Sequence, residues 1–264
     1  MILKGERILP VMSELQKINK KILDFYEISI DNVLLYSIQY TEYNRFKREG
    51  EVLGFSGLMG SQRTEIVRCI FGLDKFDSGE VYLHSKRVKT FNSSQAMKNG
   101  IAIVTKDRKR DGIFDIMSVN DNLTISALPL INKFGWIKFN KEKELVLKQL
   151  KSLDIKIVSV NQPIIKLSGG NQQKVILGRT LAVNPKLLIL DEPIRGIDVG
   201  AKAEIHKIIS EIVKTKIAVI IISSELPEIL GVSDRIIVLH QGKIKVELNY
   251  KEATQEKVLT SALT

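Results

Sequence analysis

The chain has 264 residues, of which 44% are hydrophobic and 27% charged, and its formal net charge is +10 at pH 7. This composition excludes a fibrous or disordered chain, and the longest apolar run, Ile217–Ile222, is too short for a membrane span. A single cysteine, Cys69, excludes a disulfide framework. We therefore expect a cytoplasmic globular protein without a secretory leader.

The first half of the chain predicts strands around one helix. Residues 1–21 are polar without a strand period, and we interpret them as a linker or arm. Two strand-like runs, Ile22–Ile30 and Tyr36–Phe46, follow with partial alternation of apolar side chains. A turn and a short buried strand then end at Gly57, and Thr64–Phe71 is predicted as a helix.

The pattern changes after Ile101–Lys106, an apolar run typical of a buried parallel strand. Residues from about 113 to 165 are predicted as a helical insertion, because Lys141–Leu153 places leucines among charges at helical spacing. Apolar strands and helices then alternate, which indicates βαβ units on a mainly parallel sheet. A hairpin through Gln241-Gly242 ends the predicted domain, which covers residues 22–250. A helical tail is predicted after it, over residues 251–264. The alternating elements are a helix at 170–182, a strand at 186–192, a helix at 200–214 and a strand at 217–224.

The segment Leu167–Lys174 reads LSGGNQQK and opens one of these helices. Gly169 and Gly170 let backbone N–H groups approach an anion closely, and the hydroxyl of Ser168 adds a donor. The helix N-terminus adds its partial positive charge. The alternative is an ordinary loop with an N-cap. A chance match of five fixed residues is improbable, so this alternative is weak.

A second polar group follows the apolar run that starts at Leu187. Asp191 and Glu192 come at the carboxyl end of this predicted strand, where open α/β sheets bind ligands. An aspartate there suits Mg²⁺, and the adjacent glutamate can polarise an attacking water. Such a strand end is more often a plain turn, but its position 23 residues after Ser168 favours a site.

The segment GLMGSQRTE, which begins at Gly57, has the outline of a phosphate-binding loop. Gly60 and Thr64 stand where such a loop needs them. Gln62, however, stands where glycine takes a positive φ freely, and Arg63 where a compact lysine is usual. We expect the loop to form and to hold a nucleotide poorly.

Together these segments resemble the ATP-binding cassette (ABC) ATPases, from about Ile22 onward. LSGGNQQ resembles the family signature, LLILDE the Walker B strand, and Gly196–Gly200, GIDVG, the D-loop with its acidic Asp198. Four further segments point to one subgroup of this family: GLMGSQRTE, KDRKRDGIF, DEPIRGIDVGAK and SSELPEILGVSDRIIVL. These resemble the second cassette of bacterial sugar importers of the ribose/galactose type, in which two cassettes are fused in one chain of roughly twice this length.

The resemblance implies an α/β fold of the P-loop NTPase (RecA-like) kind, with a mainly parallel sheet, an antiparallel β subdomain and a helical insertion subdomain. It implies ATP and Mg²⁺ as cofactors. Nucleotide contacts are expected from Gly57, Gly60, Arg63, Thr64, Ser168, Gly169, Gly170 and Gln172, metal binding from Thr64 and Asp191, and catalytic roles for Glu192 and Asp198.

Three positions depart from an active cassette of this family. Gln62 replaces a loop glycine, Ser224 stands at the place of the histidine that contacts the γ-phosphate, and Lys106 replaces a glutamine. Tyr36 is a candidate to stack on adenine. Paired cassettes place each ATP between one Walker A loop and the opposite signature. We therefore expect this chain to complete the site of a partner cassette and to contribute little at its own.

The resemblance also implies membrane permease subunits as partners, a periplasmic sugar-binding protein indirectly, and a location on the inner face of the cell membrane. Two alternatives stay open: a soluble cassette protein acting on nucleic acid or ribosomes, and an inactive remnant of a split gene. The net charge favours the former, since fifteen Lys/Arg and seven Asp/Glu lie between His84 and Lys156. The densest part, Thr105–Gly112, lacks interleaved aromatic residues, which argues against nucleic acid.

Overall fold

The computed structural model describes residues 26–30, 33–37, 50–75, 80–83, 86–90, 92–133 and 135–263. The chain divides into two compact units, residues 1–47 with 76–88, and residues 48–75 with 89–264. The predicted arm, residues 1–21, lies outside the described residues.

The first unit contains an antiparallel sheet of order β1-β2-β4-β5. Ile30 pairs with Val33, so only Asp31 and Asn32 separate β1 from β2 in the sequence, the spacing of a two-residue hairpin loop. The second strand therefore starts earlier than the predicted Tyr36, which lies inside β2. The strands are β1 (Tyr26–Ile30), β2 (Val33–Ser37), β4 (Glu80–Leu83) and β5 (Lys86–Val88).

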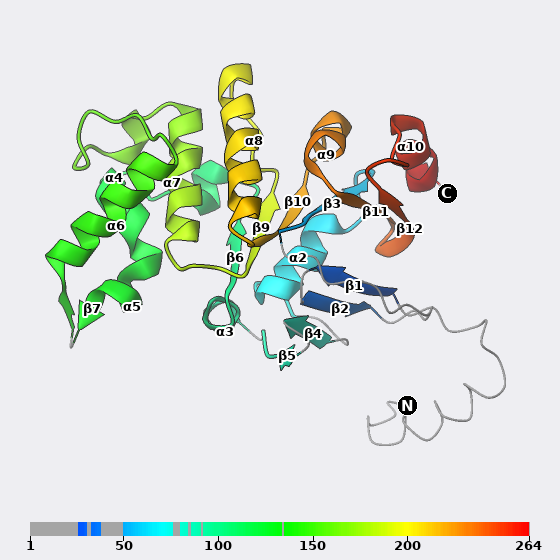
Figure 1. Ribbon diagram of the computed structural model, residues 1–264, viewed down its shortest axis with the longest axis horizontal. Coiled ribbons are helices and arrows are strands. Elements are labelled where there is room, and N and C mark those ends of the chain that lie inside the picture. Colours follow the sequence, from blue (N-terminus) through cyan, green and yellow to red (C-terminus); the bar gives the residue numbers. More distant parts are fainter. Residues whose placement is uncertain are drawn as a thin grey trace. The chain divides into compact units, whose positions relative to one another are not determined.

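The second unit is built on a six-stranded sheet of order β12-β11-β3-β10-β9-β6 (Figure 1). All neighbours in it pair in parallel except β12, which pairs antiparallel with β11 at the edge. This mainly parallel sheet confirms the predicted fold class. The strands are β3 (Val52–Gly57), β6 (Ile101–Val104), β9 (Leu187–Asp191), β10 (Ala218–Ile222), β11 (Arg235–His240) and β12 (Lys243–Asn249).

The two central strands β9 and β10 are buried at every position. Helices cover both faces of such a sheet, so these strands read as continuous apolar runs rather than alternating ones. Each fully buried leucine or isoleucine contributes about 1.5–3 kcal/mol. Because β3, β6, β9 and β10 are parallel, their carboxyl ends meet at one edge, where polar groups can converge.

The helices that pack on this sheet start and end at recognisable signals. Ser168 and Asp198 cap the starts of α7 and α8 with their side chains, and α2 ends at Gly72, whose φ is +74°. The helices are α2 (Arg63–Phe71), α3 (Ser93–Lys98), α7 (Gly169–Leu181), α8 (Val199–Lys214), α9 (Leu226–Val232) and α10 (Gln255–Leu263).

A mostly helical segment lies between β6 and α7 in the sequence. Ser118 and Asp121 form a reciprocal capping box at the start of α4, and α4 packs against both α6 and α7. The segment comprises a π-helical turn (Arg108–Gly112), α4 (Val119–Thr124), a 3₁₀ turn (Ile125–Ala127), α5 (Leu128–Ile131), β7 (Asn132–Lys133), β8 (Trp136–Ile137), α6 (Phe139–Ser152) and a 3₁₀ turn (Ile164–Lys166).

The predicted hairpin near the C-terminal end is confirmed. Gln241 and Gly242 join β11 to β12 with φ of +49° and +75°, as a type I′ turn requires. The backbone N–H of Gly242 donates to the carbonyl of Ser61 at 3.2 Å. This turn therefore supports the loop that follows β3.

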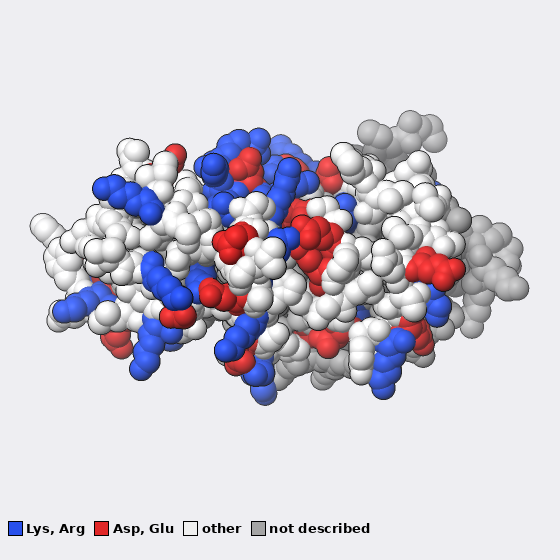
Figure 2. Space-filling view, turned by 90° about the horizontal axis from the view of Figure 1, so that it is seen from above, with Lys and Arg blue, Asp and Glu red and all other residues white. Residues whose placement is uncertain are grey.

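No helix in the described part of the chain is both long and apolar enough to cross a membrane. On the face seen from above, basic and acidic side chains lie side by side (Figure 2). The excess positive charge is interrupted by acidic groups on that face.

Candidate functional site

The loop from Gly57 to Thr64 joins β3 to α2 and curls back on itself, since Ser61 N–H donates to Leu58 carbonyl at 3.1 Å. A Cβ at Gly57 would collide with the carbonyl of Leu239 on β11. Gly60 has φ of +82°, a conformation that glycine adopts without strain. Both glycines are therefore required by the course of the loop.

Gln62 occupies the position where the sequence led us to expect glycine, and it does adopt the left-handed conformation, with φ of 66° and ψ of 25°. This conformation costs a residue with a Cβ about 1–2 kcal/mol. The side-chain amide of Gln62 lies against Gly242, where any added Cβ would meet it. The loop thus keeps its shape with a strained residue at the start of α2.

Arg63 turns toward the carboxyl ends of the central strands. Its Nη1 donates to the carbonyl of Ser223 at 3.0 Å. Burial lowers the pKa of the guanidinium, and the nearby Glu192 and Asp191 oppose that shift. One donor of the planar fork is thereby committed to the protein rather than to a ligand.

Thr64 and Asp191, the two predicted metal ligands, lie together. Thr64 Oγ1 donates to Asp191 Oδ1 at 3.3 Å. Asp191 is only 3% exposed, and this burial raises the pKa of its carboxyl to about 6, against the opposing charge of Lys106. A carboxylate and a hydroxyl oxygen side by side fit the oxygen preference of Mg²⁺.

Among the described residues, no group of three or more His, Cys, Asp or Glu is placed to hold a metal ion. A Mg²⁺ ion at Thr64 and Asp191 would therefore need further oxygens, as in sites where nucleotide phosphates complete the coordination.

Glu192 follows β9 with φ of 52°. Its backbone N–H donates to Ile222 carbonyl at 2.9 Å, and Ser224 Oγ donates to Glu192 Oε2 at 3.1 Å. A residue in this conformation carries backbone strain, which is common at functional sites. Ser224, which follows β10, thus holds the carboxylate in place.

A second group of predicted residues lies at the start of α7. Ser168 Oγ accepts from the backbone N–H of Asn171 at 3.4 Å. A Cβ at Gly169 would stand 3.1 Å from Nη2 of Arg108, and one at Gly170 would collide with Ala201 on α8. The glycines therefore let the first turn of α7 lie close to α8 and to Arg108.

Asp198 caps α8, with Ala201 N–H donating to its Oδ1 at 2.9 Å. Gln172, which we predicted as a nucleotide contact, has its side-chain amide engaged within the protein. It is buried, and its Nε2 donates to the carbonyls of Ile164 and Leu167 at 3.4 and 3.2 Å. Its amide N–H groups therefore fix the turn before α7.

Arg108 is the residue at this site that the sequence did not identify. Its Nε and Nη1 are buried without a hydrogen-bond partner in the described part of the chain, and burial lowers its pKa. It belongs to the basic run Thr105–Gly112, in which the sequence singled out no individual residue. Nothing in the spacing of that run distinguishes a side chain that turns inward against Gly169.

The site therefore consists of two groups. One joins the loop after β3 to Asp191, Glu192 and Ser224, and the other joins Ser168, Gly169 and Arg108. They lie at the starts of α2 and α7, and these helices stand on different sides of α8 in Figure 1. Each group can present backbone N–H donors and a cation to an anion.

A phosphate loop with carboxylates at the ends of a parallel sheet, and a glycine-rich helix start beyond a helical insertion, together define the class of ATP-binding cassettes. The family model for ABC transporters matches residues 45–195. The chain belongs to this family.

Curated relatives give the same result. The chain is 48% identical over 217 residues to a protein named ribose import ATP-binding protein RbsA, from Caldanaerobacter subterraneus subsp. tengcongensis, which covers 82% of this chain and 44% of that protein. It is 48% identical over 221 residues to the xylose import ATP-binding protein XylG of Escherichia coli (strain K12), over 82% of this chain and 42% of that protein. The chain spans less than half the length of these relatives.

Solved structures share the fold. The ADP conformation of an ATP-binding cassette of an ABC transporter matches with a TM-score of 0.67 and 25% identity, over 81% of this chain and 88% of that one. A nucleotide-free ATP-binding cassette from an ABC transporter matches with a TM-score of 0.68 and 25% identity, over 89% of this chain and 96% of that one.

Proposed function

We propose that this chain is the C-terminal cassette of the ATPase that energises a bacterial sugar importer. It completes the ATP site of a partner cassette with its signature helix and contributes little at its own loop. One contrast carries this proposal: the start of α7 keeps every residue of the family signature, whereas the loop before α2 holds a strained Gln62 and a diverted Arg63.

A monosaccharide as the transported substrate is supported by the relatives, whose names refer to ribose and xylose import. The share of those proteins that the chain covers, 44% and 42%, is what a single cassette of a fused pair would cover. The partner cassette is accordingly an N-terminal half or a homologous chain.

At the partner's ATP, this chain's role is electrostatic. The backbone N–H groups at the start of α7 and the hydroxyl of Ser168 would donate to phosphate oxygens, and charge developing on the transferred phosphoryl group strengthens such bonds. Arg108 lies against Gly169 with buried unpaired nitrogens, and it supplies positive charge behind these donors. Asp198 fixes the turn that leads into α8 and lies next to that surface.

At this chain's own loop, Thr64 and Asp191 would hold Mg²⁺, which neutralises phosphate charge when bound. Glu192 is the group that would orient or polarise water. Its carboxylate is engaged by Ser224, a neutral hydroxyl at the place where active cassettes have a histidine. This substitution and Gln62 together predict slow turnover at this site.

A partner cassette is also supported by exposed apolar side chains beside the motifs. Met59 in the loop is fully exposed, Ile165 before α7 is 59% exposed, and Val199 after Asp198 is 83% exposed. Apolar side chains around a functional surface are typical of interfaces. We assign the remaining contacts to permease subunits, which would hold the protein on the cytoplasmic face of the membrane, with a periplasmic sugar-binding protein acting through them.

The test is ATP hydrolysis by the purified chain, alone and mixed with a cassette that carries an intact Walker A loop. We expect less than about 1 s⁻¹ alone, the low edge of enzyme turnover, and clear stimulation in the mixture. Faster turnover by the chain alone contradicts the impaired site. A folded, associated mixture without ATPase activity contradicts the half-site and favours an inactive remnant.

A further inference from the structure

The outer end of the helical insertion carries a cluster of exposed apolar side chains. This insertion tip comprises α5, the β7–β8 hairpin and the first turn of α6, residues 128–142, and Figure 1 shows β7 well away from the six-stranded sheet. Trp136 is 81% exposed and Phe139 is 77% exposed, and Leu130 and Ile137 are exposed beside them. Single exposed apolar residues are ordinary, but four within ten positions of one segment indicate an interaction surface.

Backbone hydrogen bonds hold this tip in one arrangement. Asn132 pairs with Ile137 across the hairpin, and the Asn132 side chain accepts from the backbone N–H of Gly135 at 3.0 Å. The N–H of Lys138 donates to the carbonyl of Ile131 at 2.9 Å, and the side chain of Ile131 is buried. The core of the insertion thus uses other side chains, so its packing does not account for the exposed aromatic residues.

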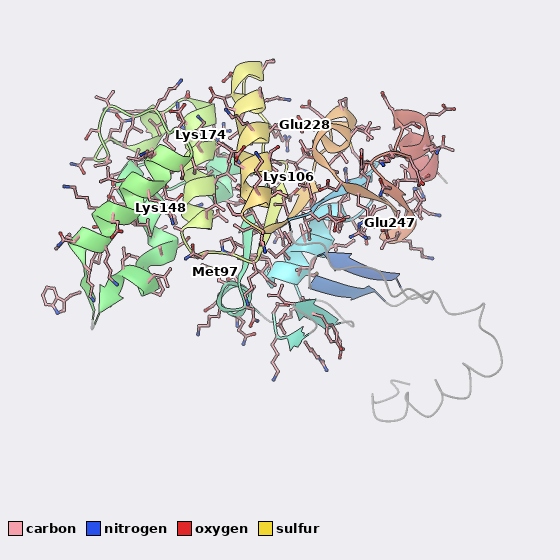
Figure 3. All side chains as sticks on the ribbon, viewed as in Figure 1. Met97, Lys106, Lys148, Lys174, Glu228 and Glu247 are labelled. Atoms are coloured by element: carbon pink, nitrogen blue, oxygen red, sulfur yellow. The ribbon has the colours of Figure 1, made fainter. Side chains whose placement is uncertain are left out.

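Positive charge lies next to these apolar residues. Three exposed lysines stand at the start of α6: Lys138, Lys141 and Lys143. Lys148, which Figure 3 shows further along α6, and Lys151 extend this basic stretch. None of the five forms an ion pair with any residue that the structure describes. Their charge is therefore available to a partner.

Acidic groups do not cancel this charge. α6 contains two acids, Glu142 and Glu144. The carboxylate of Glu142 is engaged within the insertion, because its Oε1 accepts from Asn120 Nδ2 on α4 at 3.0 Å. Residues 138–152 keep an excess of three positive charges. The surface beside the aromatic residues therefore attracts an anionic partner.

Exposed aromatic side chains next to unpaired lysines fit the boundary of an anionic lipid bilayer. Tryptophan concentrates at that boundary because its amphipathic ring sits at the level of the headgroups. Each lysine near an anionic bilayer strengthens binding by about five-fold. An acidic protein would need pockets that match the apolar side chains, whereas a bilayer accepts them on the end of a short hairpin.

We propose that the insertion tip binds the surface of an anionic lipid bilayer. Trp136 and Phe139 enter the headgroup region, and the lysines of α6 contact the lipid phosphates. The tip contains no residue of either motif group, so this contact goes beyond the proposed function. It attaches the chain to the membrane directly and does not require permease subunits.

Vesicle binding by the nucleotide-free chain is the test, and Trp136, its single tryptophan, reports the contact. The probes are vesicles of phosphatidylcholine with phosphatidylglycerol in about equal amounts, and of phosphatidylcholine alone. We expect co-sedimentation with the anionic vesicles at about 1 mM lipid, where even an anchor of ~10⁴ M⁻¹ is mostly bound. Binding should be at least ~10-fold weaker without the anionic lipid, or in about 1 M salt, where the Debye length is about 3 Å.

Charge variants locate the contact on the tip. Lys138→Glu with Lys141→Glu removes two lysines beside the aromatic residues and should weaken binding at least ~20-fold. The matched pair Lys98→Glu with Lys257→Glu makes the same change of net charge at exposed positions outside the tip. Because salt screens distant charges, this pair should change binding by less than about 3-fold.

An apolar variant tests the other half of the surface. Phe139→Ser keeps Trp136 as the reporter and should weaken binding at least ~5-fold, since less apolar surface enters the bilayer. Val158→Ser, at an exposed position outside the tip, is the matched control and should bind like the wild type. Circular dichroism of all variants shows whether each one keeps the native fold.

The wild-type chain gives a readout that needs no variant. On anionic vesicles the emission of Trp136 should shift to shorter wavelength, and lipids with brominated chains should quench it. The proposal is overturned if the chain does not bind these vesicles, or if it binds with unchanged and unquenched emission, which would place the contact elsewhere. Equal binding to both vesicle types, or equal affinity of folded tip and control variants, also overturns it.

Discussion

The loop before α2 and the start of α7 are two glycine-rich helix starts in one chain, and they differ in how each helix begins. At α7, Gly169 and Gly170 allow close approach of neighbouring groups, and Ser168 caps the helix with its side chain. At α2, Gln62 holds a left-handed conformation without a side-chain cap. The backbone shape survives in both, so the difference lies in which donors remain for a ligand.

This comparison separates fold from function. A phosphate loop needs its backbone geometry to exist, and the turn at Gly242 and the glycines at 57 and 60 secure it here. Binding further needs a free cation and unobstructed N–H groups. Arg63 is already bonded to Ser223. The loop thus keeps its backbone shape for structural reasons that do not require it to bind a ligand.

The largest effect is expected from Gly169→Asp in the mixed pair of cassettes. The substitution adds bulk and negative charge at the start of α7, beside Arg108, where donors must face phosphate. ATP turnover should fall at least ~10²-fold, the usual scale for losing one transition-state donor. Gly231→Asp, at an exposed position with open space around it, is the matched control. Equal rates for the two variants would contradict a role of the start of α7 in ATP hydrolysis.

The second largest effect is expected on the pH dependence of stability, through the buried carboxyl of Asp191. The folded pKa of Asp191 is about 6, above its ordinary 3.8, so the folded state keeps its proton while the unfolded state loses it. Stability from this group therefore falls as pH rises from about 4 to 6 and is level above that. In metal-free buffer Asp191→Asn should lack this decline and be more stable above pH 6 by about 3 kcal/mol, the free energy of a shift of about two pKa units.

Urea unfolding between pH 4 and pH 7 measures this effect, with the exposed Asp115→Asn as control. The same pH dependence in the wild-type chain and in Asp191→Asn would mean that burial does not shift this carboxyl. Addition of Mg²⁺ should favour the ionised wild-type carboxylate and leave the asparagine variant unchanged.

Restoring the usual glycine and lysine in the loop before α2 should strengthen nucleotide binding there. Gln62→Gly combined with Arg63→Lys removes the left-handed Cβ and frees a compact cation for phosphate. We expect a fluorescent ATP analogue to bind at least ~10-fold more tightly, about the value of one charged hydrogen bond. Unchanged affinity would place the defect elsewhere, with the adenine contact, for which Tyr36 is the candidate, next in line.

The smallest effect is expected from Gln62→Gly alone on stability. Relief of the left-handed conformation stabilises the folded loop by about 1–2 kcal/mol, while the freer unfolded glycine offsets about 0.4–1 kcal/mol of it. Thermal unfolding should therefore show a net gain within about 1 kcal/mol. A clear loss of stability would mean that the contact of the Gln62 amide with Gly242 outweighs the strain.

The sequence predicted those parts of the fold whose signals are local. β9 and β10 are continuous apolar runs, the Gln241-Gly242 pair specifies its turn, and α7 begins at its glycines. The second strand of the first unit was placed too late, because we followed the aromatic residues after Tyr36 and not the Asp31-Asn32 pair before Val33.

The site was predictable in its composition but not in its orientations. Thr64 and Asp191, which we predicted as metal ligands, lie within hydrogen-bond distance of each other, because parallel strands bring their carboxyl ends to one edge. Gln172 turns inward to bond with backbone carbonyls, and Arg108 turns in toward Gly169. Side-chain direction at such positions is decided by tertiary contacts, which a one-dimensional pattern does not contain.

The position of β3 has a consequence for the time at which the chain can fold on the ribosome. β3 lies between β10 and β11, Val52 pairs with Val219, and the backbone N–H of Val52 donates to Asp234 at 2.9 Å. At 5–20 residues per second these partners leave the ribosome roughly 10–30 s after β3. The loop after β3 is therefore synthesised early, but it can take its folded shape only after β10 and β11 have emerged. During that interval both edges of β3 lack their partner strands and are accessible to chaperones.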